Sequence, residues 1–122
     1  MDMPSAPDAR PDCREVSEVL SRVGDKWTMQ VVVSLRDQPR RFNELKRQVG
    51  DISQQMLTRT LKILERDGMV ERTVCPTTPP QVEYALTALG HSLSEPVRHL
   101  ARWARENIAT IHDNRLRYDS SR

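Results

Sequence analysis

Residues 41–67 constrain the fold of this chain more than any other segment, because their pattern predicts a helix, a tight turn and a second helix. In the second helix, at 53–67, Leu57, Leu61 and Leu64 recur at i, i+4 and i+7 and therefore share one face. Gly50 can supply the left-handed conformation that the turn needs, and Ser53 is a favourable N-cap. The sequence therefore predicts a helix-turn-helix whose apolar face packs on a core.

The opposite face of the second helix is polar and cationic and contains no carboxylate. Glutamine and arginine can form paired hydrogen bonds with base edges, while lysine and arginine neutralise phosphates. The first two turns should reach bases, because recognition helices insert their N-terminal half into the groove. The alternative is an ordinary solvated helix face. We expect the DNA-contacting residues of this segment to be Ser53, Gln54, Gln55, Thr58, Arg59 and Lys62.

The segments before and after 41–67 also show patterns that predict secondary structure. Helices are predicted at 12–23, which Gly24 ends, and from Lys26 to Leu35, which Asp25 can cap. Two β-branched, alternating segments, 69–75 and 82–86, flank a proline-rich stretch and predict a β-hairpin with an extended tip. A long helix follows Thr87, and Pro96 should kink or restart it.

The order of these elements predicts a mainly α fold with a small β-hairpin (α+β). It is a winged helix-turn-helix with an additional helix at each end for dimerisation. At 122 residues the chain is long enough for one modest core and so for one domain. We expect a disordered tail at 1–11, a DNA-binding and dimerisation domain at 12–112, and a frayed tail at 113–122.

Several classes of protein do not fit the sequence. No run of 18 apolar residues predicts a membrane span, and the first residues lack the apolar centre of a signal peptide. Two distant cysteines favour a reducing cytoplasm over a disulfide scaffold. There is no Gly-rich phosphate loop, no nucleophile elbow and no clustered His/Cys/Asp/Glu set. We therefore expect no enzyme activity, no cofactor, no metal site and no membrane partner.

Five strings together resemble the HxlR family of bacterial transcriptional regulators, which are close relatives of MarR proteins. They are GDKWT at 24–28, RRFNEL at 40–45, IS at 52–53 together with LT at 57–58, LKILERDGMVER at 61–72 and PPQVEYALTALG at 79–90. The resemblance covers about 13–103. It implies a homodimer that binds a palindromic promoter element, often as a repressor and sometimes as an activator. It also implies that helix 53–67 enters the major groove and that the wing lies at the minor groove.

The sequence departs from the family pattern at two positions. Cys75 stands where an aromatic or other large residue is frequent, and Arg14 follows Cys13 where proline is common. Neither departure affects the predicted fold, and both leave the regulatory behaviour open.

Cations and hydroxyls outside the second helix are further candidates for DNA contact. Arg40 and Arg41 precede the first helix of the motif and could clamp a phosphate, although a solubilising pair is the alternative. The wing carries no charge from Cys75 to Val82, which is unusual for a segment that enters the minor groove. We therefore expect the wing to position the protein through phosphate or sugar contacts, or to contribute little. The wing candidates are Arg72, Thr77 and Thr78.

The predicted first and last helices both carry apolar stripes that the winged core does not need. A soluble monomer avoids leaving such a contiguous patch in water, so two copies should bury it about a two-fold axis. This arrangement would set two recognition helices about one turn of duplex apart, roughly 34 Å. The expected dimerisation residues are Val16, Val19, Leu20, Val97, Leu100, Trp103, Ala104, Ile108 and Ile111.

Regulation by an effector is a further expectation. Cys13 lies at a helix start beside Arg14, where a thiolate is stabilised, and some members of the resembled family sense oxidants or electrophiles through a cysteine near this position. An inert thiol is the alternative. A small ligand would have to bind at the dimer interface or between it and the DNA-binding core, and the sequence designates no such pocket.

Two hypotheses about function therefore remain. The first is a dimeric, cytoplasmic transcriptional regulator, most often a repressor in the resembled family, that binds double-stranded DNA at a palindromic operator. The second is a winged-helix protein-interaction module without specific DNA binding. Salt-dependent binding to one specific palindrome distinguishes the first from the second.

Overall fold

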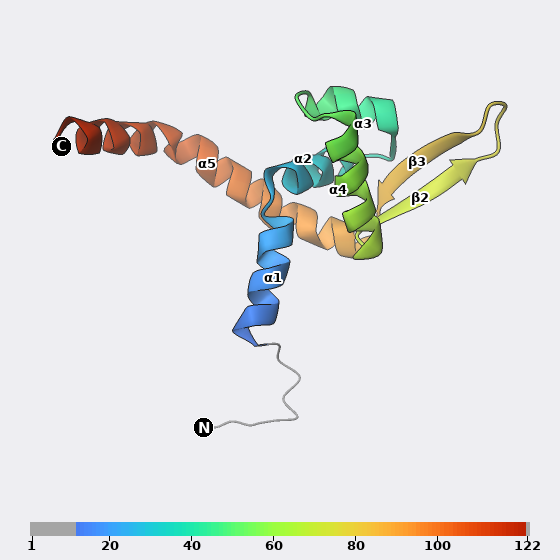
Figure 1. Ribbon diagram of the computed structural model, residues 1–122, viewed down its shortest axis with the longest axis horizontal. Coiled ribbons are helices and arrows are strands. Elements are labelled where there is room, and N and C mark those ends of the chain that lie inside the picture. The colour runs from blue at the N-terminus through green and yellow to red at the C-terminus, as the bar shows by residue number, and fades with distance from the viewer. Residues whose placement is uncertain (1–11, 122) are drawn as a thin grey trace.

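The computed structural model describes residues 12–121, so the tail expected at 1–11 lies outside the described residues. Five helices and three strands follow one another along this part of the chain (Figure 1). They are α1 (Cys13–Val23), α2 (Lys26–Leu35), β1 (Arg40–Arg41), α3 (Phe42–Val49), α4 (Gln54–Arg66), β2 (Val70–Cys75), β3 (Gln81–Leu86) and α5 (Ala88–Ser120). The predicted fold class is confirmed.

The starts of α2, α4 and α5 lie where the sequence predicted them, because a local side-chain cap fixes each of the three. Asp25, Ser53 and Thr87 each accept a hydrogen bond from a backbone N–H two or three residues further on. Gly50 and Gly68 follow α3 and α4 with φ values of +89° and +78°. Only glycine adopts this backbone conformation without strain, which explains why both helices end there.

The three strands form one antiparallel sheet in the order β1-β3-β2. The predicted hairpin is confirmed, with a register that runs from Val70 opposite Leu86 to Cys75 opposite Gln81. The third strand was not predicted. β1 has only two residues, and Arg40 lies opposite Tyr84 of β3. Two residues are too few to show an alternating pattern, so this strand is visible only once β3 lies beside it.

The core is organised around α2, which packs on α3, α4 and α5. The Leu57, Leu61 and Leu64 face of α4 is buried against it, as the spacing predicted. Ile52, just before the Ser53 cap, is also buried and holds the start of α4 in the core. The fully enclosed core side chains are Val31, Val32, Leu35, Leu45, Ile52, Leu57, Leu61 and Leu64.

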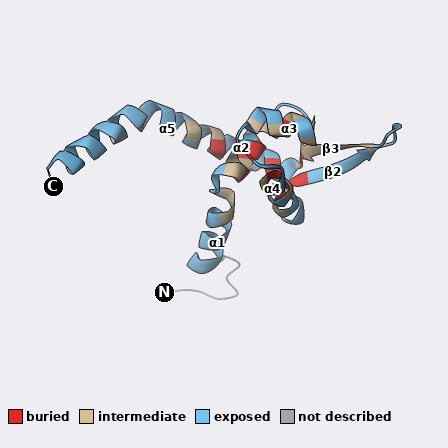
Figure 2. Ribbon diagram, turned by 45° about the horizontal axis from the view of Figure 1, so that its top comes forward, coloured by how far each residue is buried: buried red, intermediate tan, exposed pale blue. Residues whose placement is uncertain are grey.

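Helix α5 differs from the prediction at its C-terminal end, because it stays helical to Ser120 instead of fraying in the 113–122 segment. It also runs through Pro96 without a break, so of the two predicted effects of Pro96 a restart does not occur. Only its first part packs on the core, where Gly90, Ser94 and Val97 are buried. The rest extends away from the core with an exposed surface, on the side opposite the β2–β3 wing (Figures 1 and 2).

An ion pair strengthens the contact between α2 and α5. Arg36 donates to Glu95 at 2.8 Å, and Arg98 approaches the same carboxylate oxygen at 3.2 Å. The hydrogen bond from Arg36 holds the pKa of Glu95 below its ordinary value, and Arg98 lowers this pKa further.

Helix α1 is held loosely. It buries no residue of its own, and its main packing partner is α2. Its last turn is tied to the end of α4 by Arg22, which lies 3.1 Å from an oxygen of Asp67. No helix within residues 12–121 combines the length and the hydropathy needed to span a bilayer.

Candidate nucleic-acid interface

The exposed face of α4 is a row of four long polar side chains. Gln55, Arg59, Lys62 and Arg66 all lie on the side opposite the buried leucines, and all four are exposed. Because the leucine face is locked in the core, the direction in which this row points is fixed. The row therefore presents amide and guanidinium groups to solvent from a rigid helix, which suits contact with base edges and phosphates.

The row carries an uncompensated positive charge. Asp67, at the C-terminal end of α4, is engaged by Arg22 of α1 at 3.1 Å, which leaves its charge paired. Within residues 12–121, Arg59, Lys62 and Arg66 form no ion pair with a carboxylate. Three unpaired cations along one helix face attract a polyanion.

The beginning of α4 also faces solvent. Ser53 accepts a hydrogen bond from the Met56 N–H at 3.0 Å, so its side chain is committed to capping the helix. Gln54 is exposed, and Thr58 is half-buried at the edge of the polar row. Of the predicted α4 residues, Gln54, Gln55, Arg59 and Lys62 are therefore the ones most free to reach a ligand.

The structure adds residues of α3 that the sequence analysis did not single out. Asn43, Lys46 and Arg47 surround a shallow hollow beside the Gly50 turn. The first helix of a helix-turn-helix crosses the DNA backbone, so a cation here can meet a phosphate. The sequence did not distinguish these cations, because cations in the last turn of a helix are expected from the helix dipole alone.

The wing is a projecting hairpin in which most of β2 and the tip are exposed, whereas β3 is half-buried (Figures 1 and 2). Arg72 and Thr78 face solvent. The Thr77 hydroxyl donates to the Pro79 carbonyl at 2.7 Å and so stabilises the tip instead of standing free. Among the predicted wing residues, Arg72 is the one that carries a charge.

The two predicted clamp arginines have different surroundings. Arg41 is exposed at the start of α3. Arg40 is half-buried, and its Nε donates to the Ser34 carbonyl at 2.6 Å. Its side chain lines a groove formed by α2, α3 and α5, a groove to which α4 contributes no residue. The structure therefore does not bring Arg40 to the α4 face.

Most of the predicted dimerisation residues are exposed in the single chain. Val19, Leu20, Leu100 and Trp103 expose between 53% and 61% of their surface. Val16, Ala104 and Ile108 are also exposed, and Ile111 is half-buried. Val97 is different, because it is buried inside the chain and belongs to the packing of α5 on α2. This burial removes it from the surface that a second copy could reach.

Both cysteines are free thiols. Cys13 is exposed at the first position of α1, and Cys75 is half-buried at the end of β2. The start of α1 and the tip of the wing lie at different ends of the molecule (Figure 1). Residues 12–121 hold no group of three or more His, Cys, Asp or Glu side chains placed to bind a metal ion.

Comparison with known proteins gives a consistent result. The HxlR-like helix-turn-helix family matches residues 22–112. The uncharacterized HTH-type transcriptional regulator YtfH of Escherichia coli strain K12 is 42% identical over 94 residues, which cover 77% of this chain and 75% of YtfH.

Two solved structures of redox-treated or redox-active regulators are also similar. The redox regulator HypR in its reduced form is 36% identical with a TM-score of 0.75, over 81% of this chain and 98% of HypR. Diamide-treated YodB from B. subtilis is 35% identical with a TM-score of 0.68, over 80% of this chain and 96% of YodB.

Proposed function

The chain belongs to the HxlR-like helix-turn-helix family and is a transcriptional regulator, not an enzyme, and from that premise we propose that it binds a palindromic operator as a homodimer and represses transcription. The observation that carries the proposal is the exposed polar row of α4. It stands on a buried leucine face and holds unpaired cations. The protein would act in the cytoplasm, where the chromosome lies.

In this proposal α4 lies in the major groove. The helix has 13 residues and is about 20 Å long, so its N-terminal half can reach bases while its C-terminal half leaves the groove. Gln55 and Arg59 are one turn apart on the exposed face and would contact base edges. Lys62 lies further along and would meet phosphate, together with Lys46 and Arg47 of α3.

The wing would position the protein and not select the sequence. Its tip is uncharged, and the Thr77 hydroxyl is already bonded within the tip. Arg72 on β2 and the exposed Thr78 would contact the backbone beside the groove.

The exposed apolar surface of α1 and α5 supports the homodimer. Leu20 exposes 61% of its surface and Trp103 exposes 55%. Several large apolar side chains exposed along two helices are unusual for a soluble monomer. Two copies that pack these helices about a two-fold axis would bury them and would present two α4 helices to successive major grooves.

A redox response is the finer part of the proposal. The similar proteins HypR and YodB are described as a redox regulator and as a diamide-treated structure. In this chain the exposed Cys13, at the N-terminus of α1, is the accessible thiol. With a peroxide as the oxidant, its thiolate would attack one peroxide oxygen, forming a sulfenic acid on Cys13 as the O–O bond breaks and the other oxygen leaves as hydroxide. The altered α1 would then change how the dimer holds its two α4 helices.

The test is selection of bound duplexes from a random pool, followed by mobility-shift titration of the selected site. We expect a palindrome with half-site centres about one helical turn, roughly 34 Å, apart. Arg59→Ala and Gln55→Ala should each weaken binding to this site by about 1–3 kcal/mol, because each removes one base contact. The thermal stability of both variants should match that of the wild type, since neither side chain is in the core.

Glu65→Gln is the matched control on the same helix. Glu65 is exposed but lies off the polar row, so its replacement should leave the choice of site unchanged. Operator affinity that is unchanged in both Arg59→Ala and Gln55→Ala would refute the placement of α4 in the groove. Weak duplex binding with no preference between sequences would favour the protein-interaction module instead.

A further inference from the structure

Helix α5 carries a row of arginines where it leaves the core. Arg98, Arg102 and Arg105 follow one another at i, i+4 and i+7 and therefore share one face of the helix. Together with Arg36, which directly follows α2, they line a hollow of about 250 Å³. We call this surface the arginine hollow. Within residues 12–121, α3, α4 and the wing contribute no residue to it, so it is separate from the candidate nucleic-acid interface.

The arginine hollow has an excess of positive charge. Glu95 is shared by two of its arginines, because Arg36 donates to it at 2.8 Å and Arg98 approaches it at 3.2 Å. Arg102 and Arg105 are exposed, and within residues 12–121 neither forms an ion pair. Asp37 is the one carboxylate in the lining. Four guanidinium groups therefore stand against the carboxylates of Glu95 and Asp37.

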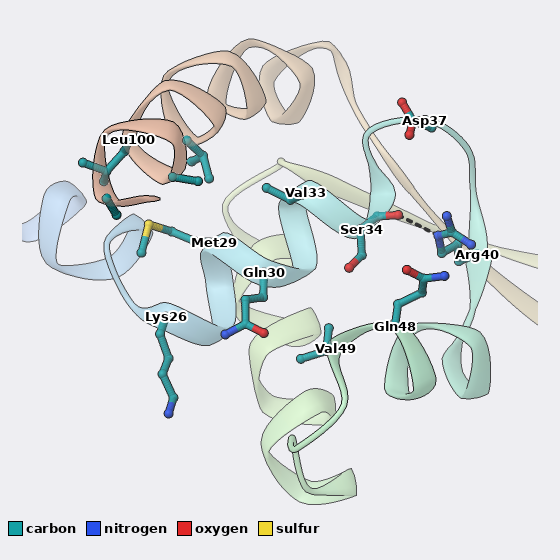
Figure 3. A pocket seen from close by; sticks show the side chains of 13 residues that line it. Lys26, Met29, Gln30, Val33, Ser34, Asp37, Arg40, Gln48, Val49 and Leu100 are labelled. Carbon is teal, nitrogen blue, oxygen red and sulfur yellow. Dashed lines mark hydrogen bonds between the residues drawn. The ribbon is translucent and has the colours of Figure 1, made fainter. Parts of the chain in front are cut away.

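The lining of the arginine hollow also has an apolar part. Val33 of α2 exposes 41% of its surface, and Figure 3 shows its side chain turned toward α5. Ala101, which is half-buried, is the apolar residue that α5 contributes. An exposed valine and an alanine between arginines leave room for one apolar side chain of a partner.

This combination favours an acidic peptide over a nucleic acid. Arginine pairs with a carboxylate through two parallel hydrogen bonds, and arginine clusters are a recurring means of recognising acidic motifs. The backbone of a duplex presents phosphate and sugar and offers no apolar side chain to cover Val33. We propose that the arginine hollow binds an acidic segment of a partner protein. Carboxylates of the segment pair with Arg102 and Arg105, and one apolar side chain packs against Val33 and Ala101.

The arginine row lies apart from the apolar stripe of α5. At 3.6 residues per turn, the row is roughly a third of a turn around the helix from Leu100 and Ala104. Leu100 and Ala104 border a different, larger groove, shown in Figure 3, whose lining includes none of the four arginines. The acidic segment can therefore bind while the stripe contacts a second copy. Recruitment of the partner to an operator rests on the proposed function, whereas binding of the segment does not.

The first experiment measures fluorescence anisotropy of two labelled synthetic peptides with the full-length protein. One is Glu-Glu-Leu-Glu-Glu, and the other has serine in place of the leucine. We expect the leucine peptide to bind about fivefold more tightly, because only leucine gains from apolar contact with the hollow. A double variant with Arg102→Glu and Arg105→Glu should weaken its binding by about tenfold or more, because like charges then face each other.

The matched control is a double variant with Arg115→Glu and Arg117→Glu. It makes the same change of charge on exposed residues further along α5, outside the arginine hollow, and should bind the leucine peptide like the wild type. An equal loss in the two double variants would overturn the proposal, because the peptide would then respond only to the net charge of the protein. The absence of measurable binding of the leucine peptide to the wild type would overturn it as well.

Val33→Thr tests the apolar contact without changing the size of the side chain. The preference for the leucine peptide over the serine peptide should fall below about twofold, since the hydroxyl replaces a methyl group at the contact. Val74→Thr makes the same exchange on the wing, where Val74 exposes 53% of its surface, and should keep the preference of the wild type. Equal binding of both peptides by the wild type, or an unchanged preference in Val33→Thr, would refute the apolar contact and with it the proposal.

Sedimentation and operator titration test whether another macromolecule uses the arginine hollow. The double variant of Arg102 and Arg105 should sediment like the wild type, and its operator affinity should equal that of the double variant of Arg115 and Arg117. A change in sedimentation would assign the hollow to the contact between copies, and a selective loss of operator binding would assign it to the duplex. Either result would overturn the proposal. If the leucine peptide binds as expected and no preferred duplex exists, only the proposed function fails.

Discussion

Replacing Gly90 by alanine tests how α5 is joined to the rest of the winged helix-turn-helix. Gly90 is buried in the first turn of α5. A Cβ atom at this position would lie 2.1 Å from the Met69 carbonyl oxygen and 2.9 Å from Cδ2 of Leu86. The Met69 carbonyl is held in place, because it accepts the Thr87 N–H at 3.0 Å. The backbone must therefore move before an alanine fits.

Gly90→Ala has opposing effects on the free energy of unfolding, so the measured change shows which effect is larger. Helix propensity alone favours alanine over glycine by about 1 kcal/mol. Overpacking costs roughly 1–3 kcal/mol, and a contact as short as 2.1 Å against backbone belongs at the upper end. Displacing the Met69 carbonyl also weakens its hydrogen bond with Thr87, which is worth about 1 kcal/mol. We expect Gly90→Ala to lower the free energy of unfolding by about 2–3 kcal/mol.

The assay is urea unfolding followed by circular dichroism, at one protein concentration, because the apparent stability of a protein that associates depends on its concentration. Ser92→Ala is the control, since Ser92 is exposed two residues further along the same helix. It should change the free energy of unfolding by less than about 0.5 kcal/mol. An unfolding midpoint for Gly90→Ala equal to or above that of the wild type would show that helix propensity, and not the close approach, decides this site.

Three further predictions follow from the caps, the apolar stripe and the exposed thiol. Thr87→Ala should cost about 1–2 kcal/mol of stability in the same urea assay, because the Thr87 hydroxyl caps α5 and donates to the Gly68 carbonyl at 2.6 Å. A wild-type midpoint would contradict this role. Leu100→Glu should sediment as a monomer at micromolar concentration, and a persistent dimer would move the interface elsewhere. Diamide should change the operator affinity of the wild type and not of Cys13→Ser; an identical response in both would place the sensor at another residue.

The sequence by itself determined the features that depend only on interactions between residues close together in the chain. A cap such as Ser53 acts on an N–H three residues away, and the leucine spacing of α4 is fixed by the helical repeat. These interactions need no distant partner, so the helix starts, the hairpin and the polar row of α4 could all be predicted. The five strings that resemble the HxlR family extended this prediction to the whole winged helix-turn-helix.

Only the tertiary structure decided which surfaces are covered. β1 exists because β3 lies beside it, and Arg40 lines a groove because α2 brings the Ser34 carbonyl to its Nε. Val97 and Leu100 are three residues apart on one predicted stripe, yet α2 buries the first and leaves the second exposed. Periodicity tells which residues share a face, but the length and position of the helix that packs against them determine how much of that face remains free.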